Sequence, residues 1–441
     1  MIGLIEFFRK KCLYILVAII LVACQSEIIP EPFRPRNAYD AYAHALKQTH
    51  LDETALGKDW FNSSEQALQQ PIKVSSPFRE SLYLDPSKAE AIGYRLHVKR
   101  GQKIEVAVVL PTDSLKVFID LFRVNNDSLK DWRHVASADT VHFLLGFEPR
   151  RDADYILRLQ PELLRGGKFE ISIRQVPSLD FPVLGKDSQA IGSFFGDPRD
   201  GGKRDHHGVD IFAKKRTPIL APSKAYVRNV STRGLGGKVV WLYDSKRRIS
   251  MYFAHLDSQI VKARTYVEPG DTLGLVGNSG NARYTPSHLH FGIYSNGPID
   301  PYHFLKETKT TFEPIIASRD NLGLWMRIQQ LTYLVETPNG RLPGDTLGIS
   351  ELVKVTGVSS DRYRVRLVDG RQGYIPGSVL EAIENSIENI SIASYKEILV
   401  APGKLAIGEV YSGDSLEILG GNNQYRMVRT RSGQQGWISM D

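Results

Sequence analysis

Cysteine is nearly absent from this sequence: only Cys12 and Cys24 occur among 441 residues. Cys12 lies in an N-terminal segment with the features of an export signal. An exported mature chain would therefore keep Cys24 alone and could form no internal disulfide. This excludes a disulfide-stapled scaffold, so packing and any bound metal must stabilise the fold.

Long hydrophobic runs are also missing, apart from one near the start of the chain. The apolar run Leu13–Ala23 follows the basic residues Arg9, Lys10 and Lys11. It is shorter than the roughly 20 residues that a membrane-spanning helix needs. A positive start, a short apolar stretch and small residues at its end are typical of an export signal.

The end of this run has a specific pattern. Leu21-Val22-Ala23-Cys24 resembles the lipobox of bacterial lipoproteins, in which the cysteine is acylated and becomes the first mature residue. The resemblance implies that Cys24 anchors the chain to a membrane of the cell envelope, expected to be the outer membrane on its periplasmic side. The alternative is a short uncleaved membrane helix. Three prolines within Ile28–Arg36 then predict an extended tether.

Neither charge sign dominates strongly. Charged residues make up 24% of the chain, and the formal net charge is +7. No basic run is interleaved with aromatic residues, which argues against nucleic-acid binding. The mild positive bias suits an anionic envelope surface. The 42% hydrophobic content is that of ordinary globular proteins, and the length predicts several domains.

Apolar spacing predicts the elements that precede the histidine-rich region. Helical spacing predicts a helix over Ala38–Gln48 and a second helical turn around Glu53–Phe61. From Ile72 to Val176 the period changes to two, which predicts a β-sandwich. The strand order loosely resembles the pre-peptidase β-domains of secreted bacterial enzymes.

Five of the 11 histidines fall in three clusters. In the first, Asp205–Ile211, we predict an extended segment in which residues at even spacing share a face. His206 and Asp210 then point the same way, whereas His207 points to the other side. Gly208 between them leaves open volume for a metal and its water. Alone, this spacing is common by chance.

The other two clusters also lie on predicted strands. His288 and His290 share one face at spacing two, which makes sense if one neutral ring binds a metal and the other handles protons. The alternative is an exposed pair on a solvated strand face. His255 comes at the end of a predicted strand that begins at Ile249, where catalytic groups are commonly displayed.

Taken together and in this order, the clusters resemble the lysostaphin-type (LytM) zinc endopeptidases that degrade peptidoglycan. The similarity runs from about Ile191 to Leu305. It includes turn-forming motifs around the clusters: Gly192–Gly196, Thr217–Pro222, Val267–Asp271, Gly277–Gly280 and Asn296–Pro301.

The resemblance implies that His206, Asp210 and His290 bind one zinc ion. It also implies that His255 and His288 act on the reacting water and the developing oxyanion, and that peptidoglycan stem peptides are the substrate. The segment Asn281–Ser287 is longer than in many relatives. There Arg283 or Tyr284 would contact the peptide, or the loop is simply solvated.

The C-terminal region contains an internal repeat. Tyr363-Arg364-Val365 through Ile375 can be laid beside Tyr425-Arg426-Met427 through Ile438, and a Gly-Asp pair precedes each copy. The copies resemble bacterial SH3-like domains, which in this setting often bind wall peptides. The alternative is a pair of spacers, each with a buried aromatic residue.

We therefore predict a mainly β, multidomain chain that is a zinc metalloendopeptidase of peptidoglycan. The alternatives are a wall-binding adhesin, or a non-hydrolytic scaffold or amidase activator built on the same domain. A regulatory protein partner is a further expectation. The predicted boundaries are 1–23 for the signal peptide, 24–70 for the tether and short helices, 71–177 for the β-sandwich, 178–310 for the metallopeptidase, and 325–383 and 390–441 for the SH3-like repeats.

Overall fold

The computed structural model describes residues 35–110, 116–125, 128–309, 311–340, 344–422 and 424–440. The predicted export signal and the predicted lipidation site Cys24 lie outside these residues. Within the described ranges, no helix combines the length and the apolar character that crossing a membrane requires. The chain divides into two compact units, with the boundary after His50.

The first unit contributes helix α2 (Ala38–Gln48), over the range that the spacing predicts. The Asn37 side chain caps its start by accepting a hydrogen bond from the Asp40 amide at 2.7 Å, and Leu46 is its buried residue.

The second unit begins with η2 (Leu51–Glu53) and helix α3 (Ala55–Gln69), which is longer than the predicted turn. Helix α3 buries one face that includes Trp60, Ala67 and Leu68. The Trp60 indole donates a hydrogen bond to the carbonyl of Pro161 at 2.9 Å, which fixes the helix against the sheet that follows.

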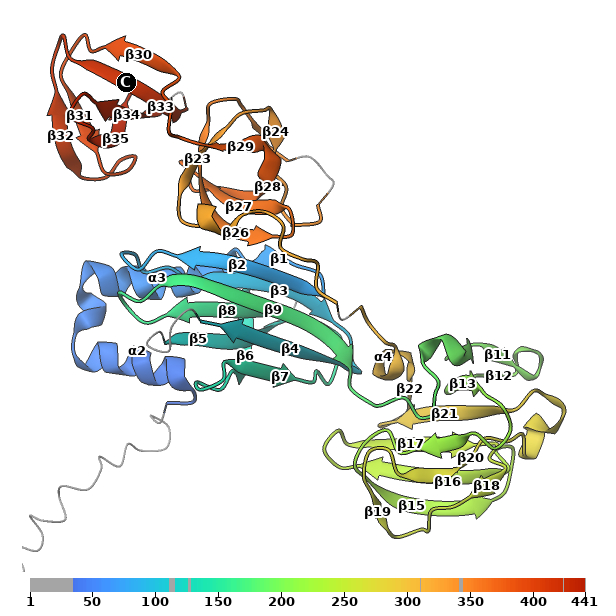
Figure 1. Ribbon diagram of the computed structural model, residues 1–441. Coiled ribbons are helices and arrows are strands. Elements are labelled where there is room, and N and C mark those ends of the chain that lie inside the picture. Colours follow the sequence, from blue (N-terminus) through green and yellow to red (C-terminus); the bar gives the residue numbers. More distant parts are fainter. Residues whose placement is uncertain are drawn as a thin grey trace, which may run out of the picture. The chain divides into compact units, whose positions relative to one another are not determined.

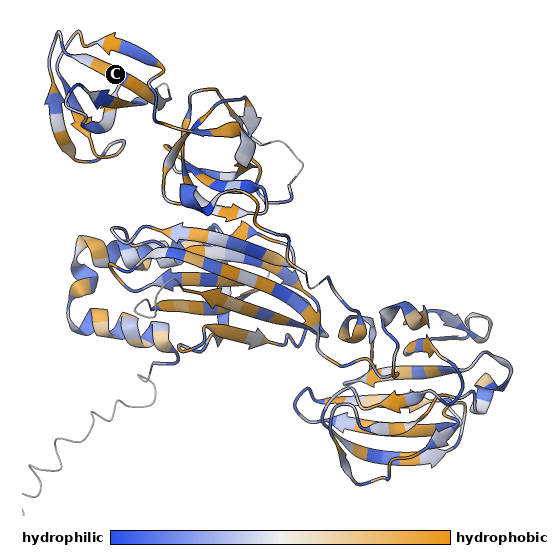
Figure 2. Ribbon diagram, viewed as in Figure 1, coloured by the Kyte–Doolittle hydropathy of each residue, from blue (hydrophilic) through white to orange (hydrophobic). Residues whose placement is uncertain are grey.

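Two sheets form the predicted sandwich region (Figure 1). Their inner faces pack a single core that includes Tyr94, Ile104, Leu157 and Phe169, because apolar residues alternate along the strands. Figure 2 shows this alternation as bands of opposite hydropathy along the strands. One sheet has the order β1 (Ile72–Lys73), β3 (Ile92–Val98), β8 (Ala153–Pro161), β5 (Val117–Asn125) and β6 (Ser128–Ser137). The other includes β2 (Phe78–Leu84), β9 (Gly167–Pro177), β4 (Gln102–Val109) and β7 (Leu144–Phe147), in that order.

The three histidine clusters lie on the strands of one antiparallel sheet or directly beside those strands. The order of this sheet is β10 (Ile191–Ser193), β13 (Val209–Phe212), β21 (His288–Tyr294), β17 (Ile249–Ala254), β16 (Lys238–Asp244), β15 (Ala225–Thr232) and β19 (Tyr266–Val267), and β22 (Pro298–Ile299) pairs with β21. Smaller elements surround it: η3 (Ser188–Ala190), β11 (Pro198–Arg199), η4 (Asp200–Gly202), β12 (Arg204–Asp205), β14 (Pro218–Leu220), β18 (Ser258–Gln259), β20 (Thr272–Leu275), η5 (Gly280–Tyr284) and α4 (Tyr302–Leu305). One face of the sheet is core, with Val209, Ile211 and Phe291 fully buried, and the other carries the polar side chains.

The C-terminal region repeats one three-strand pattern. In the first copy β26 (Leu352–Ser359), β27 (Arg362–Leu367) and β28 (Gln372–Pro376) pair in order, and β33 (Ser415–Gly421), β34 (Tyr425–Thr430) and β35 (Gln435–Ser439) do so in the second. The remaining elements are η6 (Arg319–Asn321), β23 (Trp325–Ile328), β24 (Thr332–Tyr333), β25 (Thr346–Leu347), η7 (Gly377–Val379), β29 (Leu380–Ala382), β30 (Glu388–Ser391), β31 (Lys396–Leu399) and β32 (Ala406–Val410).

The first copy shares a sheet with the sandwich region. Strand β26 pairs antiparallel with β2, so the order runs β28-β27-β26-β2-β9-β4-β7 without a break. Across this junction the buried guanidinium of Arg364 donates to the carboxylate of Glu80 at 3.0 Å. Tyr94 and Tyr374 donate to the two oxygens of the same carboxylate. The mainly β, multi-sheet fold class is confirmed, and the predicted domain boundaries stay predictions.

Candidate functional site

Neighbouring strands bring the three histidine clusters together. In the antiparallel register, Asp210 of β13 lies directly opposite His290 of β21, and His290 lies opposite Ala254, the last residue of β17. His255 follows Ala254 and therefore emerges beside the same two residues. Asp210 and His290, which are 80 positions apart in the chain, thus meet on one sheet face because the strand register places them there.

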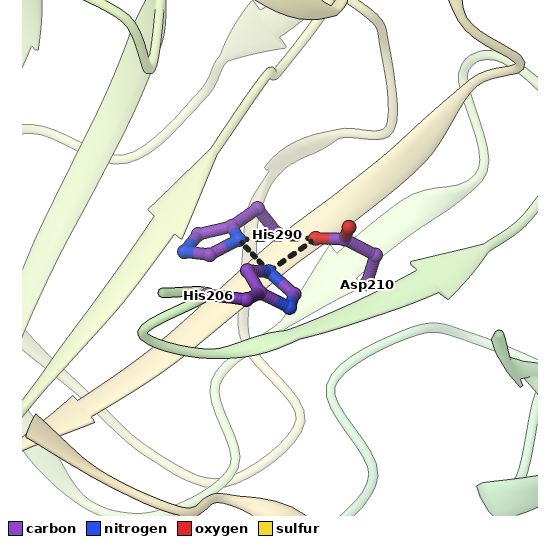
Figure 3. A group of neighbouring side chains, drawn as sticks. All are labelled: His206, Asp210 and His290. Atoms are coloured by element: carbon purple, nitrogen blue, oxygen red, sulfur yellow. Dashed lines mark hydrogen bonds and ion pairs between the residues drawn. The ribbon is translucent and has the colours of Figure 1, made fainter. Parts of the chain in front are cut away.

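Three side-chain atoms converge at this point. Nε2 of His206 lies 3.0 Å from Oδ1 of Asp210 and 2.9 Å from Nδ1 of His290. Nδ1 of His290 lies 3.0 Å from the same Oδ1. Figure 3 shows the two rings and the carboxylate pointing toward one another. Among the described residues, these three form the group that could hold a metal ion, each offering one ligand atom.

His206 occupies a loop between β12 and β13, whereas the sequence predicted an extended strand. Its backbone pairs instead with the preceding loop: its amide donates to the carbonyl of Asp197, and its carbonyl accepts from the amide of Gly196. The predicted proximity of His206 to Asp210 still holds, and His207 is exposed.

The hydrogen bonds of the His206 ring fit it for metal binding. Its Nδ1 lies 2.8 Å from the carbonyl oxygen of Phe194, which can only accept. In the neutral ring the proton therefore sits on Nδ1, and Nε2 presents its lone pair toward Asp210 and His290. A carboxylate oxygen and two imidazole nitrogens directed at one point are the donor set that zinc prefers. A carbonyl that orients the far side of the ring is a common feature of such sites.

Gly208 makes room for this arrangement. A Cβ atom at this position would come within 2.5 Å of the carbonyl oxygen of Phe291 and 2.8 Å of Cε1 of His290. The sequence predicted that Gly208 leaves volume for a metal and its water. The structure shows that the ring of His290 takes this space.

Two further rings flank the three converging residues. The centroids of His255 and His288 are 5.1 Å apart, and His255 lies 6.0 Å from His290. Nδ1 of His255 is 2.9 Å from the carbonyl of Ser279, and Nδ1 of His288 is 2.8 Å from the carbonyl of Pro286. In both neutral rings the proton therefore sits on Nδ1, which leaves Nε2 able to accept another.

Burial sets the protonation of the site. Burial lowers the pKa of His255 to about 4, and it also lowers that of His290, so both rings are neutral near pH 7. Burial on its own raises the pKa of Asp210, but the two neighbouring imidazole rings outweigh it and the net direction is down. Neutral imidazoles and an ionised carboxylate are the forms that bind a metal ion.

Sequence reasoning missed the support behind Asp210. Nη2 of Arg199 donates to Oδ2 of Asp210 at 2.8 Å and also contacts Oγ of Ser193. Arg199 lies only seven residues before His206, yet no periodic pattern marks it, because the segment between them is a β11–β12 hairpin. The sequence did offer one hint of this role, namely that an arginine lies close to the candidate metal ligands.

The segment Asn281–Ser287 overlaps η5 and carries an exposed aromatic residue. Tyr284 is 91% exposed, and the guanidinium of Arg283 lies 5.9 Å from its ring centroid. Two carbonyls near this loop, those of Ser279 and Pro286, position His255 and His288.

Comparison with known proteins agrees with this geometry. Residues 204–301 match peptidase family M23. The L-Ala–D-Glu endopeptidase of Bacillus subtilis is 34% identical over 139 residues, which cover 29% of this chain and 42% of the relative. The peptidoglycan DD-endopeptidase ShyC of Vibrio cholerae is 34% identical over 100 residues, covering 23% of this chain and 22% of the relative.

Among solved structures, the catalytic domain of the antimicrobial peptidase lysostaphin from Staphylococcus simulans is 30% identical. The match covers 26% of this chain and 89% of that domain, with a TM-score of 0.24. The chain spans less than half the length of the curated relatives it matches. The residues that match peptidase family M23, 204–301, include the His206–Asp210–His290 group.

Proposed function

We propose that the protein is a zinc-dependent endopeptidase that hydrolyses peptide cross-links of bacterial peptidoglycan. The observation that supports it most is the convergence of His206, Asp210 and His290 within about 3 Å of one another, inside a segment that matches peptidase family M23. Three protein ligands leave a fourth place for water, which is the pattern of catalytic zinc sites.

When bound, zinc would lower the pKa of a coordinated water to about 7 and polarise the scissile carbonyl. The residues of the chain supply the rest. Of His255 and His288, one ring would take the proton of the reacting water on its free Nε2, and the other, when it carries a proton on Nε2 as well, would donate that hydrogen to the negatively charged carbonyl oxygen. The low pKa of His255 keeps that ring neutral, so its Nε2 is free to accept a proton.

The proposed substrate is the stem-peptide cross-link. Two relatives are by name endopeptidases, one of an L-Ala–D-Glu bond and one a peptidoglycan DD-endopeptidase. A lipid anchor on Cys24 would place the chain at an outer membrane, where walls carry direct cross-links that end in D-alanine. We therefore infer action on those bonds, with glycine bridges as the second candidate. Mass spectrometry of the muropeptides released from purified wall would identify the bond.

Zinc content and wall hydrolysis, measured together, test the proposal. The wild type should bind one zinc ion and release cross-linked peptides from purified wall, and His290→Ala should lose both properties. The matched control is His207→Ala, because His207 is exposed and outside the group. A wild type that holds zinc but releases nothing would favour a non-hydrolytic scaffold or amidase activator, and a wild type without zinc would contradict the proposal.

The other parts of the proposal concern location and partners. We infer an envelope protein held by a lipid on Cys24, with the C-terminal copies as SH3-like modules that bind wall peptides, and with a regulatory protein partner. Metabolic labelling with a fatty-acid analogue, compared between the wild type and Cys24→Ala, tests the anchor. A labelled Cys24→Ala variant would contradict it.

A further inference from the structure

The two oxygens of the Asp210 carboxylate have different partners. Oδ1 lies 3.0 Å from Nε2 of His206 and 3.0 Å from Nδ1 of His290, on the side where the ligand candidates converge. Oδ2 accepts a hydrogen bond from Nη2 of Arg199 at 2.8 Å on the other side. Asp210 is largely buried, and the Arg199 side chain is 28% exposed. The ion pair is therefore shielded from most of the solvent.

The same nitrogen of Arg199 reaches a second group. Nη2 carries two protons, and besides Asp210 it contacts the hydroxyl of Ser193, which donates its own proton to Asp197 at 2.9 Å. Asp197 also accepts from the amide of Phe194 at 2.8 Å.

The carbonyl of Phe194 holds the ring of His206. The short segment from Ser193 to Arg199 therefore orients both Asp210 and His206. Its hydrogen bonds fix the two ligand candidates relative to each other.

We propose that Arg199 is a positioning residue that keeps Asp210 bound to the metal through Oδ1 alone, so that one coordination place stays open for the reacting water. This inference rests on the proposed function, because it requires His206, Asp210 and His290 to be zinc ligands. A carboxylate can bind a metal through one oxygen or two. If Oδ2 were released from Arg199, it could turn to the metal as an additional ligand beside the water, and the site would become five-coordinate.

The chemistry of the arginine side chain suits this role. A guanidinium cannot lose its charge near neutral pH and cannot itself bind a metal, so it competes for Oδ2 without competing for the ion. Residues that hydrogen-bond to a metal ligand on the side away from the metal usually contribute to metal affinity. Losing one lowers that affinity about 10–100-fold. Arg199→Met should therefore weaken metal binding by about that factor. It should also lower kcat with little change in KM.

The experiment uses the full chain loaded with cobalt(II), whose visible absorption is strong in four-coordinate sites and weak in five-coordinate ones. Arg199→Met should lose intensity relative to the wild type, and competition with a chromophoric chelator should show its weaker affinity. Arg199→Lys keeps a charge that can reach Oδ2 and should restore most of the wild-type spectrum. The matched control is Arg216→Met, because Arg216 is exposed and its ion-pair partner is Asp257.

The outcomes separate the two proposals. If neither the wild type nor Arg216→Met binds cobalt or zinc, the proposed function fails and this inference fails with it. If both bind the metal and Arg199→Met has the same spectrum and affinity as they do, the positioning role is wrong and the proposed function stands. Should Arg199→Met not fold, Arg199→Gln replaces it, with the same spectral change expected and the same result counting against the role.

Discussion

The backbone of His255 adopts a conformation that few residues other than glycine take. Its φ angle is 65°, in the left-handed region. The residue is held there by its amide, which donates to the carbonyl of Gly236 at 2.8 Å, and by its ring, which bonds to the carbonyl of Ser279. Such a conformation costs about 1–3 kcal/mol and persists only where the surroundings fix it. Here it turns the ring from the end of β17 toward His288 and His290.

We predict that His255→Ala separates catalysis from metal binding. The ring lies beside the proposed ligands and is not one of them, so zinc content should stay at the wild-type level. Loss of a positioned proton acceptor should lower kcat about 10²–10⁴-fold. Zinc analysis and turnover of a soluble cross-linked peptide are the measurements. Loss of zinc in this variant would assign His255 to the ligand set instead.

Unlike His255→Ala, Gly208→Ala should abolish metal binding. The added methyl group would meet the carbonyl oxygen of Phe291 at 2.5 Å, and a backbone atom cannot move aside cheaply. We expect His290 to be displaced, with zinc content and turnover lost together. The control is Gly146→Ala, where the added group meets only the flexible end of Lys103. Zinc binding by Gly208→Ala at wild-type affinity would show that the site tolerates the shift.

The sequence revealed the candidate ligands but not the groups that hydrogen-bond to them and fix their positions. Period-two spacing correctly put His288 and His290 on one strand and placed His206 close to Asp210. It could not reveal Arg199, or the carbonyls of Phe194 and Ser279, because those contacts depend on how loops fold back. Main-chain groups carry no residue-specific signal in a sequence.

At the level of single elements, a buried ion pair between strands β5 and β8 links the sandwich to helix α3. Asp120 accepts from Arg158 of β8 at 2.6 Å and from Ser137 at 2.6 Å, and the other side of Arg158 donates to Ser64 of α3. Burial alone raises the pKa of Asp120, but His134, Arg158 and Ser137 together outweigh it, and the net direction is down.

We predict that Asp120→Ala destabilises the fold by about 3–5 kcal/mol near pH 7, because a buried guanidinium loses its carboxylate. A lowered pKa in the folded state means that this contribution is complete above the unfolded-state value of about 4 and is lost as the pH falls through the folded-state value. The difference in the free energy of unfolding between the wild type and Asp120→Ala should therefore become smaller in acid. Denaturant unfolding from pH 7 to pH 3 measures it, with the exposed Asp59→Ala as control. A gap that stays constant over this range would contradict the prediction.

The sequence predicted the length of one helix correctly, but it made a second helix too short and shifted the alignment of the C-terminal repeat. Helix α2 agrees with its apolar spacing, whereas α3 extends to Gln69 because the polar run after Phe61 hides its buried face. In the C-terminal repeat, Val365 pairs with Gly373 as Val428 pairs with Gly436. The alignment of Tyr363 with Tyr425 is therefore one residue out of register, since the second copy has one more residue before its turn.

For the whole molecule, the continuous sheet was not predictable from alternation. Strand β26 pairs with β2 across more than 270 residues of sequence, and a strand's pattern shows which face is buried but not which strand lies beside it. The consequence is practical. Ending the chain before β26 would strip a neighbour from β2 and leave Glu80 without Arg364, so such a truncation would confuse wall binding with loss of stability. Ending it before β30 keeps the shared sheet intact.

The Glu80–Arg364 pair should make the sandwich and the first C-terminal copy unfold together. The side chains are 0% and 2% exposed, and Gly357 gives them room, since a Cβ there would meet Oε1 of Glu80 at 2.6 Å. Removing one partner of a buried pair costs about 3–5 kcal/mol, because the other charge stays in a medium of low polarity. Arg364→Met should therefore lower the free energy of unfolding by about that amount, and Glu80→Gln in the same chain should recover much of it.

Hydrogen exchange read by mass spectrometry locates the effect. Because β2 and β26 share a ladder, amides of β9 in the sandwich and of β27 in the first copy should lose protection to the same extent in Arg364→Met. The control is Arg371→Met, whose ion pairs with Asp345 and Asp369 are exposed and should contribute little. If β27 loses protection while β9 keeps it, the two regions unfold separately. The buried pair would then stabilise the first copy alone.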